Sequence, residues 1–389
     1  MRSKLIALKN SPAIGGILLL LAAVLAILFA NTPLHHTYEA WLETPLSFTF
    51  GEFTLGKSLH HWINDGLMVI FFLLVGMEIK RELIEGHLAE RAQAVLPVVA
   101  AVGGVVLPAL IYLGINAGSP ETQHGWAIAS ATDIAFAVGL LALFGKRLPL
   151  SLKVFITAVA VIDDLMAILI IAFFYSGELE TYQLYTALTA FAILIAMNLL
   201  RVKHLSFYLF VGFFMWLAVL QSGVHATIAG VLLGLTIPLH VEGKRGKPML
   251  KQFEHDLAPL VTYVILPLFA FANSGIPLAG MSPAVLADPV PLGIMLGLFF
   301  GKQFGIFAAS YALIKTGFAR LPEDATWREL YGVCIVGGIG FTMSLFIGML
   351  AFPGTELQNE VRIGVMSGSV LSGLLGYFFL RSTLARRAS

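Results

Sequence analysis

The sequence is poor in charged residues and has almost no cysteine. Only 12% of its 389 residues are Asp, Glu, Lys or Arg, whereas 58% are hydrophobic, and the mean hydropathy is +0.86. A soluble domain carries about 25% charged residues, so lipid must be the solvent for most of this chain. The single cysteine, Cys334, excludes an intrachain disulfide. Apolar runs recur from residue 12 to residue 380, which leaves no room for a soluble domain.

Twelve apolar runs are candidates for membrane-spanning helices, each of which needs about 20 mostly apolar residues. They lie at 12–30, 60–79, 94–115, 125–144, 150–175, 182–200, 205–220, 223–239, 255–274, 289–314, 329–351 and 361–380. The first run follows Arg2, Lys4 and Lys9, as the core of a secretory signal peptide would. It is longer than the usual core of about 7–15 residues and no Ala-x-Ala site follows, so we interpret it as an uncleaved span.

Basic residues gather in alternate loops. With a cytoplasmic N-terminus, 21 of the 24 Lys and Arg residues fall on the cytoplasmic side, Lys57 and Arg362 fall opposite, and Lys302 falls inside a span. Because positively charged loops stay in the cytoplasm, this asymmetry predicts an even number of spans with both termini cytoplasmic. The net charge of +1 gives no sign of a nucleic acid partner.

The outer loop at 42–57 alternates β-forming and polar residues on either side of Gly51, which predicts a β-hairpin. An isolated hairpin is only marginally stable in water, so we expect it to pair with its copy in a second subunit and form a homodimer. A loop without regular structure is the alternative.

Several ionisable residues lie inside the predicted spans. A carboxylate at the centre of a bilayer costs about 2.5–3.5 kcal/mol on insertion scales, so each needs a functional reason. Asp163 and Asp164 are adjacent in the middle of one span. The others are Asp65, Asp133, His225 and Lys302.

The aspartate pair suggests competition between protons and a metal cation. Burial and a neighbouring like charge both favour the protonated form of a carboxyl group, so Asp163 and Asp164 should titrate as a coupled pair. Sodium or lithium, which prefer oxygen ligands, would stabilise the charged form of the same oxygens. Lys302 is the expected counter-charge, with a side chain that reaches the membrane interface as the alternative.

Two of the spans carry residues that weaken a helix. The sequence SATDIAFA at 130–137 offers side chains that compete for backbone hydrogen bonds, and VGGIGFTMS at 336–344 contains three glycines. Irregular backbone at membrane depth is tolerated only inside the protein or beside a water-filled cavity. If the breaks meet, Asp133 can offset the partial positive charge of the facing helix N-termini and Lys302 the negative charge of the C-termini. Close helix packing is the alternative role of the glycines.

A second polar set lies at the cytoplasmic helix ends, and one histidine lies near the start of a span. Glu78 and Glu82 are four residues apart and share a helix face. Histidine is the side chain that ordinarily changes charge between pH 5 and 8. A solvated helix end and a structural histidine are the alternatives. The set comprises Glu78, Glu82, His225, Lys251, Glu254 and His255.

Seven segments together resemble the NhaA family of bacterial sodium/proton antiporters, and the likeness runs over nearly the whole chain. They are WINDGLM, FFLLVGMEIKREL, GWAIASATDIAFAVGLLAL, VIDDLMAILIIAFFY, SGVHATIAGV, LPLFAFANSG and GIGFTMSLFI. Paired broken helices mark the binding site in this family itself. The two helix-weakening segments found here are therefore not independent evidence for the resemblance. The loop at 241–250 departs from the family pattern, and Ala258 stands where a second histidine sometimes occurs. Both departures leave the activating pH open.

The resemblance implies an all-helical fold of twelve spans, with inverted repeats and crossed, unwound fourth and eleventh helices. The chain would form one transporter domain, in which helices 3–5 and 10–12 are the core repeats. Helices 1, 2, 8 and 9, with the hairpin at 42–57, would form the dimer side. Such a protein exchanges Na⁺ or Li⁺ for H⁺ in the bacterial inner membrane, electrogenically and under pH control. It is not an enzyme and has no cofactor.

The resemblance also assigns roles to residues. Asp163 and Asp164 match the essential ion-binding pair, Thr132 and Asp133 the unwound part of the fourth helix, and Lys302 the lysine of the tenth helix. The resemblance thus implies that the cation binds at Asp163, Asp164, Thr132 and Asp133. It also implies that proton transport involves Asp163, Asp164 and Lys302. The hairpin matches the dimer contact. The set of six residues at the cytoplasmic helix ends and at His225 matches positions tied to pH response.

Two other functions use charges inside the membrane. An intramembrane aspartyl protease needs two acids on facing helices, whereas Asp163 and Asp164 lie about 100° apart on one helix, and the glycine-rich eleventh span has no acid. A cation channel would pass sodium without coupling to protons. A pH-dye assay in vesicles distinguishes the channel from an exchanger.

Overall fold

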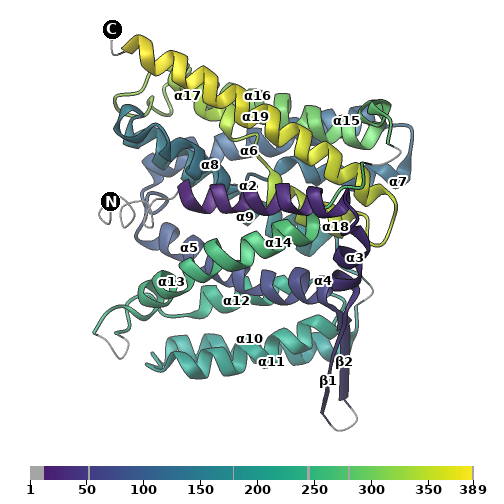
Figure 1. Ribbon diagram of the computed structural model, residues 1–389. Helices are drawn as coiled ribbons and strands as arrows, with labels where there is room; N and C mark the ends of the chain where they lie inside the picture. The colour runs from purple at the N-terminus through teal and green to yellow at the C-terminus, as the bar shows by residue number, and fades with distance from the viewer. Residues whose placement is uncertain (1–12, 51–52, 178, 243–245, 279–280, 388–389) are drawn as a thin grey trace, which may run out of the picture. The chain divides into compact units, whose positions relative to one another are not determined.

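The structure is a computed structural model that describes residues 13–50, 53–177, 179–242, 246–278 and 281–387. The described chain is almost entirely helical, with one β-hairpin (Figure 1). It divides into two compact units. The first is built from Met1–Asn31, His87–Ala167 and Asn273–Ser389, and the second from Thr32–Gly86 and Ile168–Ala272.

The first unit holds the two broken spans. Its elements in chain order are α2 (Ala13–Ala30), α6 (Arg91–Ile115), α7 (Pro120–Gln123), η2 (His124–Ser130), α8 (Ile134–Ala142), η3 (Gly145–Arg147), most of α9 (Leu150–Phe174), η5 (Pro283–Ala287), α15 (Pro289–Leu296), η6 (Gly297–Gly301), α16 (Lys302–Lys315), α17 (Trp327–Val336), α18 (Phe341–Ala351) and α19 (Leu357–Arg387). The π-helical turn η6 joins α15 to α16, so the predicted span at 289–314 is one continuous helical span.

Glycines bring α6 and α16 into backbone contact in the first unit. A Cβ atom added to Gly103 would lie 2.4 Å from the carbonyl oxygen of Gly305, and one added to Gly305 would lie 2.2 Å from that of Gly103. Only glycine allows two helices to approach so closely. Lys302, the first residue of α16, is one turn from this contact and is fully buried.

The second unit consists of the hairpin and the remaining helices. Its elements are α3 (His35–Glu43), β1 (Pro45–Phe50), β2 (Phe53–Ser58), α4 (Leu59–His61), η1 (Trp62–Leu67), α5 (Met68–Ile84), the end of α9, α10 (Thr181–Leu199), α11 (Leu205–Gln221), α12 (Thr227–Thr236), α13 (Met249–Leu260), η4 (Val261–Ile265) and α14 (Leu266–Asn273). Helices α10 and α11 run side by side (Figure 1). Helices α5 and α12 meet at glycines, since a Cβ on Gly230 would lie 2.2 Å from the carbonyl oxygen of Val69.

The predicted hairpin is confirmed. Strands β1 and β2 are antiparallel, with Pro45 opposite Ser58 and Ser47 opposite Gly56. The indole nitrogen of Trp62 donates to the carbonyl oxygen of Leu46 at 3.1 Å, and this bond ties the hairpin to η1 in its own unit. The predicted turn residue, Gly51, lies outside the described residues.

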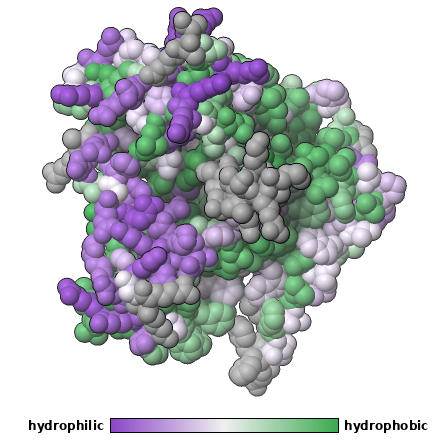
Figure 2. Space-filling model, turned by 60° about the vertical axis from the view of Figure 1, so that its left-hand side comes forward, coloured by the Kyte–Doolittle hydropathy of each residue, from purple (hydrophilic) through white to green (hydrophobic). Residues whose placement is uncertain are grey.

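Eight helices of the described chain are long and apolar enough to cross a membrane, and nine if the bent pair α17 and α18 is one span. Large apolar side chains lie exposed along them, among them Leu21 and Leu28 of α2 and Leu374 and Phe378 of α19. Figure 2 shows broad apolar areas on one face of the molecule, with hydrophilic side chains gathered apart from them. Three further helices lie in predicted spans but are not among these eight. Helix α5 ends in charged residues, and α11 and α12 are short.

Candidate functional site

The fourth predicted span is interrupted at residues 131–133. The 3₁₀-helix η2 ends at Ser130, three residues follow without helical structure, and α8 begins at Ile134. Asp133 caps the new helix, because its carboxylate accepts a hydrogen bond from the backbone N–H of Phe136 at 2.9 Å. An Asp at this position satisfies a free N–H at the helix start, which explains why the chain re-enters a helix here.

The eleventh predicted span is interrupted at residues 337–340, where α17 and α18 meet at an angle of 45°. The two interruptions lie side by side and bond to each other. The backbone N–H of Asp133 donates to the carbonyl oxygen of Ile339 at 2.7 Å. The hydroxyl of Thr132 lies 3.0 Å from the carbonyl oxygen of Gly337. Backbone groups that leave one broken helix therefore find partners in the other, as groups in a dry interior must.

The carboxylate of Asp133 accepts hydrogen bonds at the N-termini of two helices. Asp133, which caps α8, also accepts from the backbone N–H of Thr342 at 3.1 Å and from its hydroxyl at 2.5 Å, in the first turn of α18. The negative charge of Asp133 thus lies where two partial positive charges face each other. The sequence predicted this place for Asp133, but it did not single out Thr342.

Asp163 lies next to Lys302. Nζ of Lys302 donates to Oδ2 of Asp163, and the hydroxyl of Thr132 lies 2.8 Å from the same oxygen. The relative exposures are 1% for Asp163 and 0% for Lys302 and Thr132. The other oxygen of Asp163, Oδ1, is buried and has no hydrogen-bond partner among the described residues. Thr132 has one hydroxyl proton for two acceptors, Asp163 and Gly337, so it can turn toward either.

Asp164 is the neighbour of Asp163 on α9 and is equally buried, at 1% exposure. Adjacent residues point about 100° apart around a helix, so the two carboxyl groups meet different surroundings. The first unit therefore brings Thr132, Asp133, Asp163 and Lys302 together at the two interruptions. Asp164 is the chain neighbour of Asp163 and belongs to the same unit. Lys302 pairs with Asp163, and among the described residues no hydrogen bond from Lys302 to the facing helix C-termini is found.

The donor set suits a small monovalent cation. It consists of carboxylate, hydroxyl and backbone carbonyl oxygens, with no sulfur and no imidazole among the residues named above. A cation drawn to Asp163 must displace the ammonium group of Lys302 or share the carboxylate with it. Because an unpaired charge in a dry site is costly, a charged Asp163 needs a partner, which in this structure is Lys302.

The predicted cytoplasmic polar set lies in the second unit and centres on Arg81, which the sequence argument did not select. Nε of Arg81 lies 3.0 Å from both carboxylate oxygens of Glu254, and Nη1 lies 2.7 Å from Glu82. Lys251 forms an ion pair with Glu85, and the ring of His240 lies 3.2 Å from the same carboxylate. A run of alternating charges at a helix end signals ion pairs, but not which residue is shared.

The other predicted members are spread out. Glu78 is half-buried in α5, one turn before Glu82, whereas His255 is exposed on α13. His225 precedes α12 and interacts electrostatically with Asp65, so it does not join the Arg81 group. Outside the spans, the hydrogen bond and charge of Lys251 hold the pKa of Glu85 below its ordinary value.

Comparison with known proteins decides the family. The profile of a family described as "Na+/H+ antiporter 1" matches residues 7–380. The chain belongs to this family. It is 52% identical to the Na(+)/H(+) antiporter NhaA 2 of Magnetococcus marinus over 394 residues, which cover 99% of each chain. It is 53% identical to the Na(+)/H(+) antiporter NhaA of Caulobacter vibrioides, over 97% of this chain and 91% of that one.

One solved structure has a similar fold. It is that of the sodium/proton antiporter MjNhaP1 from Methanocaldococcus jannaschii, with a TM-score of 0.53 and 14% identity, covering 96% of this chain and 92% of the other. At this identity the likeness concerns the fold alone. Family membership and the long apolar helices together make the chain a multi-pass membrane protein.

Proposed function

We propose that the chain exchanges sodium or lithium ions for protons across the bacterial cytoplasmic membrane. It uses the inward proton gradient to expel the cation and moves more protons than cations in each cycle, so transport is electrogenic. The observation that carries the proposal is the fully buried contact of Lys302 with Asp163 beside two interrupted helices. Family membership supports the same function. A buried carboxylate with three alternative partners, the lysine, a proton and the cation, provides the competition that exchange requires.

The proposed cycle is alternating access around Asp163 and Asp164. The two carboxylates take protons from outside, release the cation, reorient, and exchange the protons for a cation inside. Lys302 pairs with Asp163 while no cation is bound. Thr132 offers its hydroxyl oxygen to the cation, and Asp133 holds the helix ends in place, which is consistent with its hydrogen bonds to both α8 and α18.

The proposed architecture has twelve spans, with helices 3–5 and 10–12 as inverted repeats and the two broken helices crossing. Helices α5, α11 and α12 would add three spans to the nine that meet the length test. The asymmetry of basic residues supports cytoplasmic positions for both termini.

We assign the pH response of transport to the second unit. The residues are Glu78, Glu82, His225, Lys251, Glu254 and His255. The shared contact of Glu82 and Glu254 with Arg81 supports a coupled group, since protonation of either acid changes the balance of charge around one guanidinium. Glu254→Gln should move the pH at which exchange begins without abolishing exchange at the optimum. An unchanged pH profile would contradict the assignment.

The hairpin at 42–57 is proposed as the contact of a homodimer. Each subunit owns a complete ion site, so deletion of residues 50–53 should lower the dimer fraction on cross-linking in detergent while transport continues. A dimer fraction equal to that of the wild type would refute this contact.

Exchange itself is tested in everted membrane vesicles with a pH-sensitive dye and a sodium titration at several pH values. Asp163→Asn and Asp164→Asn should each abolish sodium-driven proton movement, because the substitutions remove the charge and keep the volume. Glu121→Gln, at an exposed carboxylate of α7, is the control and should transport normally. Retained exchange in either aspartate variant, or sodium flux without proton movement in the wild type, would overturn the proposal.

A further inference from the structure

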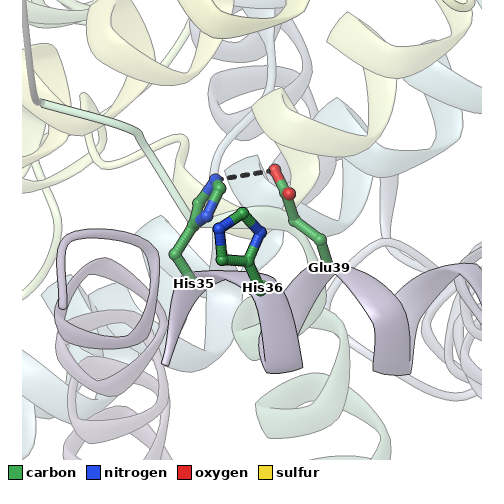
Figure 3. A group of neighbouring side chains, drawn as sticks. All are labelled: His35, His36 and Glu39. Carbon is green, nitrogen blue, oxygen red and sulfur yellow. Dashed lines mark ion pairs between the residues drawn. The ribbon is translucent and has the colours of Figure 1, made fainter. Parts of the chain in front are cut away.

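A group of metal-ligating side chains lies on α3, apart from the ion site. It consists of His35, His36 and Glu39, one ligand atom of each lying within 4.8 Å of the others. Figure 3 shows the two imidazole rings and the carboxylate gathered on the same side of the helix. Nε2 of His35 lies 3.1 Å from Oε1 of Glu39, and the two rings meet edge to face at 4.9 Å between centroids.

Helix geometry explains the grouping. Positions 35 and 39 are four residues apart and lie on one face, and position 36 is about 100° from position 35. All three ligands therefore fall within roughly a quarter to a third of the helix circumference. Two metal ligands at i and i+4 on a helix are a recurrent arrangement, because their side chains converge above one turn.

The opposite side of α3 is anchored within the second unit. Tyr38 is buried, its hydroxyl donates to the carbonyl oxygen of Phe271 at 2.7 Å, and its ring meets that of Phe271 edge to face. Trp41 also packs against Phe271. The helix backbone is thus held, while the side chains of His36 and Glu39 remain exposed.

We propose that His35, His36 and Glu39 form a binding site for a divalent transition-metal ion, with Zn²⁺ as the type. Two imidazoles and a carboxylate are the ligand set of open zinc sites, which leave the fourth position to water. Zinc bonds of about 2.0–2.2 Å place tetrahedral donors about 3.3 Å apart, so the side chains must close by up to about 1.5 Å from their present spread. Rotation of exposed side chains achieves this without moving the backbone.

The imidazoles set the selectivity of the site. Magnesium and calcium prefer sets made of oxygen ligands, whereas imidazole suits zinc, copper and nickel. The other adjacent histidine pair of the second unit differs, because His60 already lies 3.1 Å from Asn64, and His61 lies 2.9 Å from Ser58. The α3 group thus combines exposure with an acid of the right spacing.

The test is calorimetric titration of the full-length, tag-free protein in detergent with zinc chloride, and with magnesium chloride as the second probe. The wild type should bind one zinc per chain at this site and show no magnesium binding there. His36→Ala and Glu39→Gln should each weaken zinc binding at least about tenfold, since even indirect supports of a metal site cost about 10–100-fold. The control is His204→Ala, at an exposed histidine of the loop before α11, and it should bind zinc as the wild type does.

A second measurement tests whether the substitutions weaken zinc binding by destabilising the fold. All the variants should melt like the wild type without metal, because the replaced side chains are exposed. Zinc should then raise the melting temperature of the wild type and His204→Ala by mass action, but not that of His36→Ala or Glu39→Gln. Wild-type zinc affinity in either of the two site variants, or equal affinity of the wild type for magnesium, would overturn the proposal.

Discussion

The two units of the chain use ion pairs in opposite environments. In the first unit the side chains of Lys302 and Asp163 are both 0% exposed, whereas in the second unit Arg81 is 33% and Glu254 15% exposed. A buried pair is held by the cost of separating its members, while a pair near solvent exchanges partners with water at little cost. The buried environment of the first unit suits an ion site whose carboxylate always needs a charge partner. The second suits a group that responds to pH in small steps.

The largest effect should come from removing one member of the buried pair. Lys302→Ala leaves Asp163 uncompensated, so we expect a loss of about 3–5 kcal/mol in the free energy of unfolding. Adding Asp163→Asn should restore part of it, because a pair removed together is close to neutral for stability. Thermal unfolding in detergent measures both variants.

The matched control is Lys315→Ala, at the exposed end of the same helix, which should change stability by no more than about 0.5 kcal/mol. If Lys302→Ala and Asp163→Asn destabilise additively, their coupling energy is near zero. The comparison between the two units would then fail, because the buried pair would behave like a surface pair.

A second large effect should follow from crowding the glycine contact that positions Lys302. In Gly305→Ala the new Cβ would lie 2.2 Å from the carbonyl oxygen of Gly103, so α6 and α16 must separate. We expect a loss of about 1–3 kcal/mol, as for overpacking in a core. Gly114→Ala, where a Cβ meets nothing within 4 Å, is the control and should be neutral or slightly stabilising. Equal melting temperatures for the two variants would show that this helix contact can relax freely.

The residues of the ion site could be predicted because a charge in an apolar run is conspicuous. Asp163, Asp164, Asp133 and Lys302 stand out within their spans, and the helix breaks follow from glycines and from side chains that compete with backbone bonds. The partners of Asp133 were harder to predict. Thr342 looks like an ordinary helical threonine in the sequence, yet its hydroxyl and N–H bind Asp133, 209 residues away.

Helix bounds and polar loops were predicted less well, for physical reasons. The run at 223–239 is mostly apolar, but the helix there spans only Thr227–Thr236. A turn with Gly223 at φ +81° precedes this helix, and Ile237 at its end is extended. Hydropathy does not detect such backbone turns. The role of Arg81 was missed because a helix end of mixed charge allows many ion pairs. Which of these pairs form depends on how α5 and α13 pack.

An intermediate effect should come from the half-exposed group of the second unit. Arg81→Gln removes the charge that Glu82 and Glu254 share, so we expect a loss of roughly 1 kcal/mol, the upper end for pairs near solvent. Thermal unfolding at pH 8 measures this loss, and Lys146→Gln, at an exposed lysine of η3 in the first unit, is the control. A loss as large as that of Lys302→Ala would mean that the Arg81 group is effectively dry.

The smallest effect belongs to Glu85 and Lys251, the most exposed pair of the comparison. The hydrogen bond and charge of Lys251 hold the pKa of Glu85 below its ordinary value. A lowered pKa means that the pair stabilises the fold above the ordinary glutamate pKa of about 4.3, and that this contribution disappears as the pH falls through the lower folded value. Glu85→Gln should therefore lower the melting temperature slightly at pH 7.

Salt distinguishes this exposed pair from the buried one. Choline chloride is the right salt, because sodium is the proposed substrate. At about 1 M salt the screening length is about 3 Å, so the difference between Glu85→Gln and the wild type should vanish. The deficit of Lys302→Ala should persist, since salt screens a fully buried pair much less than an exposed one. If salt instead removes both deficits equally, Lys302 and Asp163 are screened by solvent, and the two units do not differ in the way that their burial predicts.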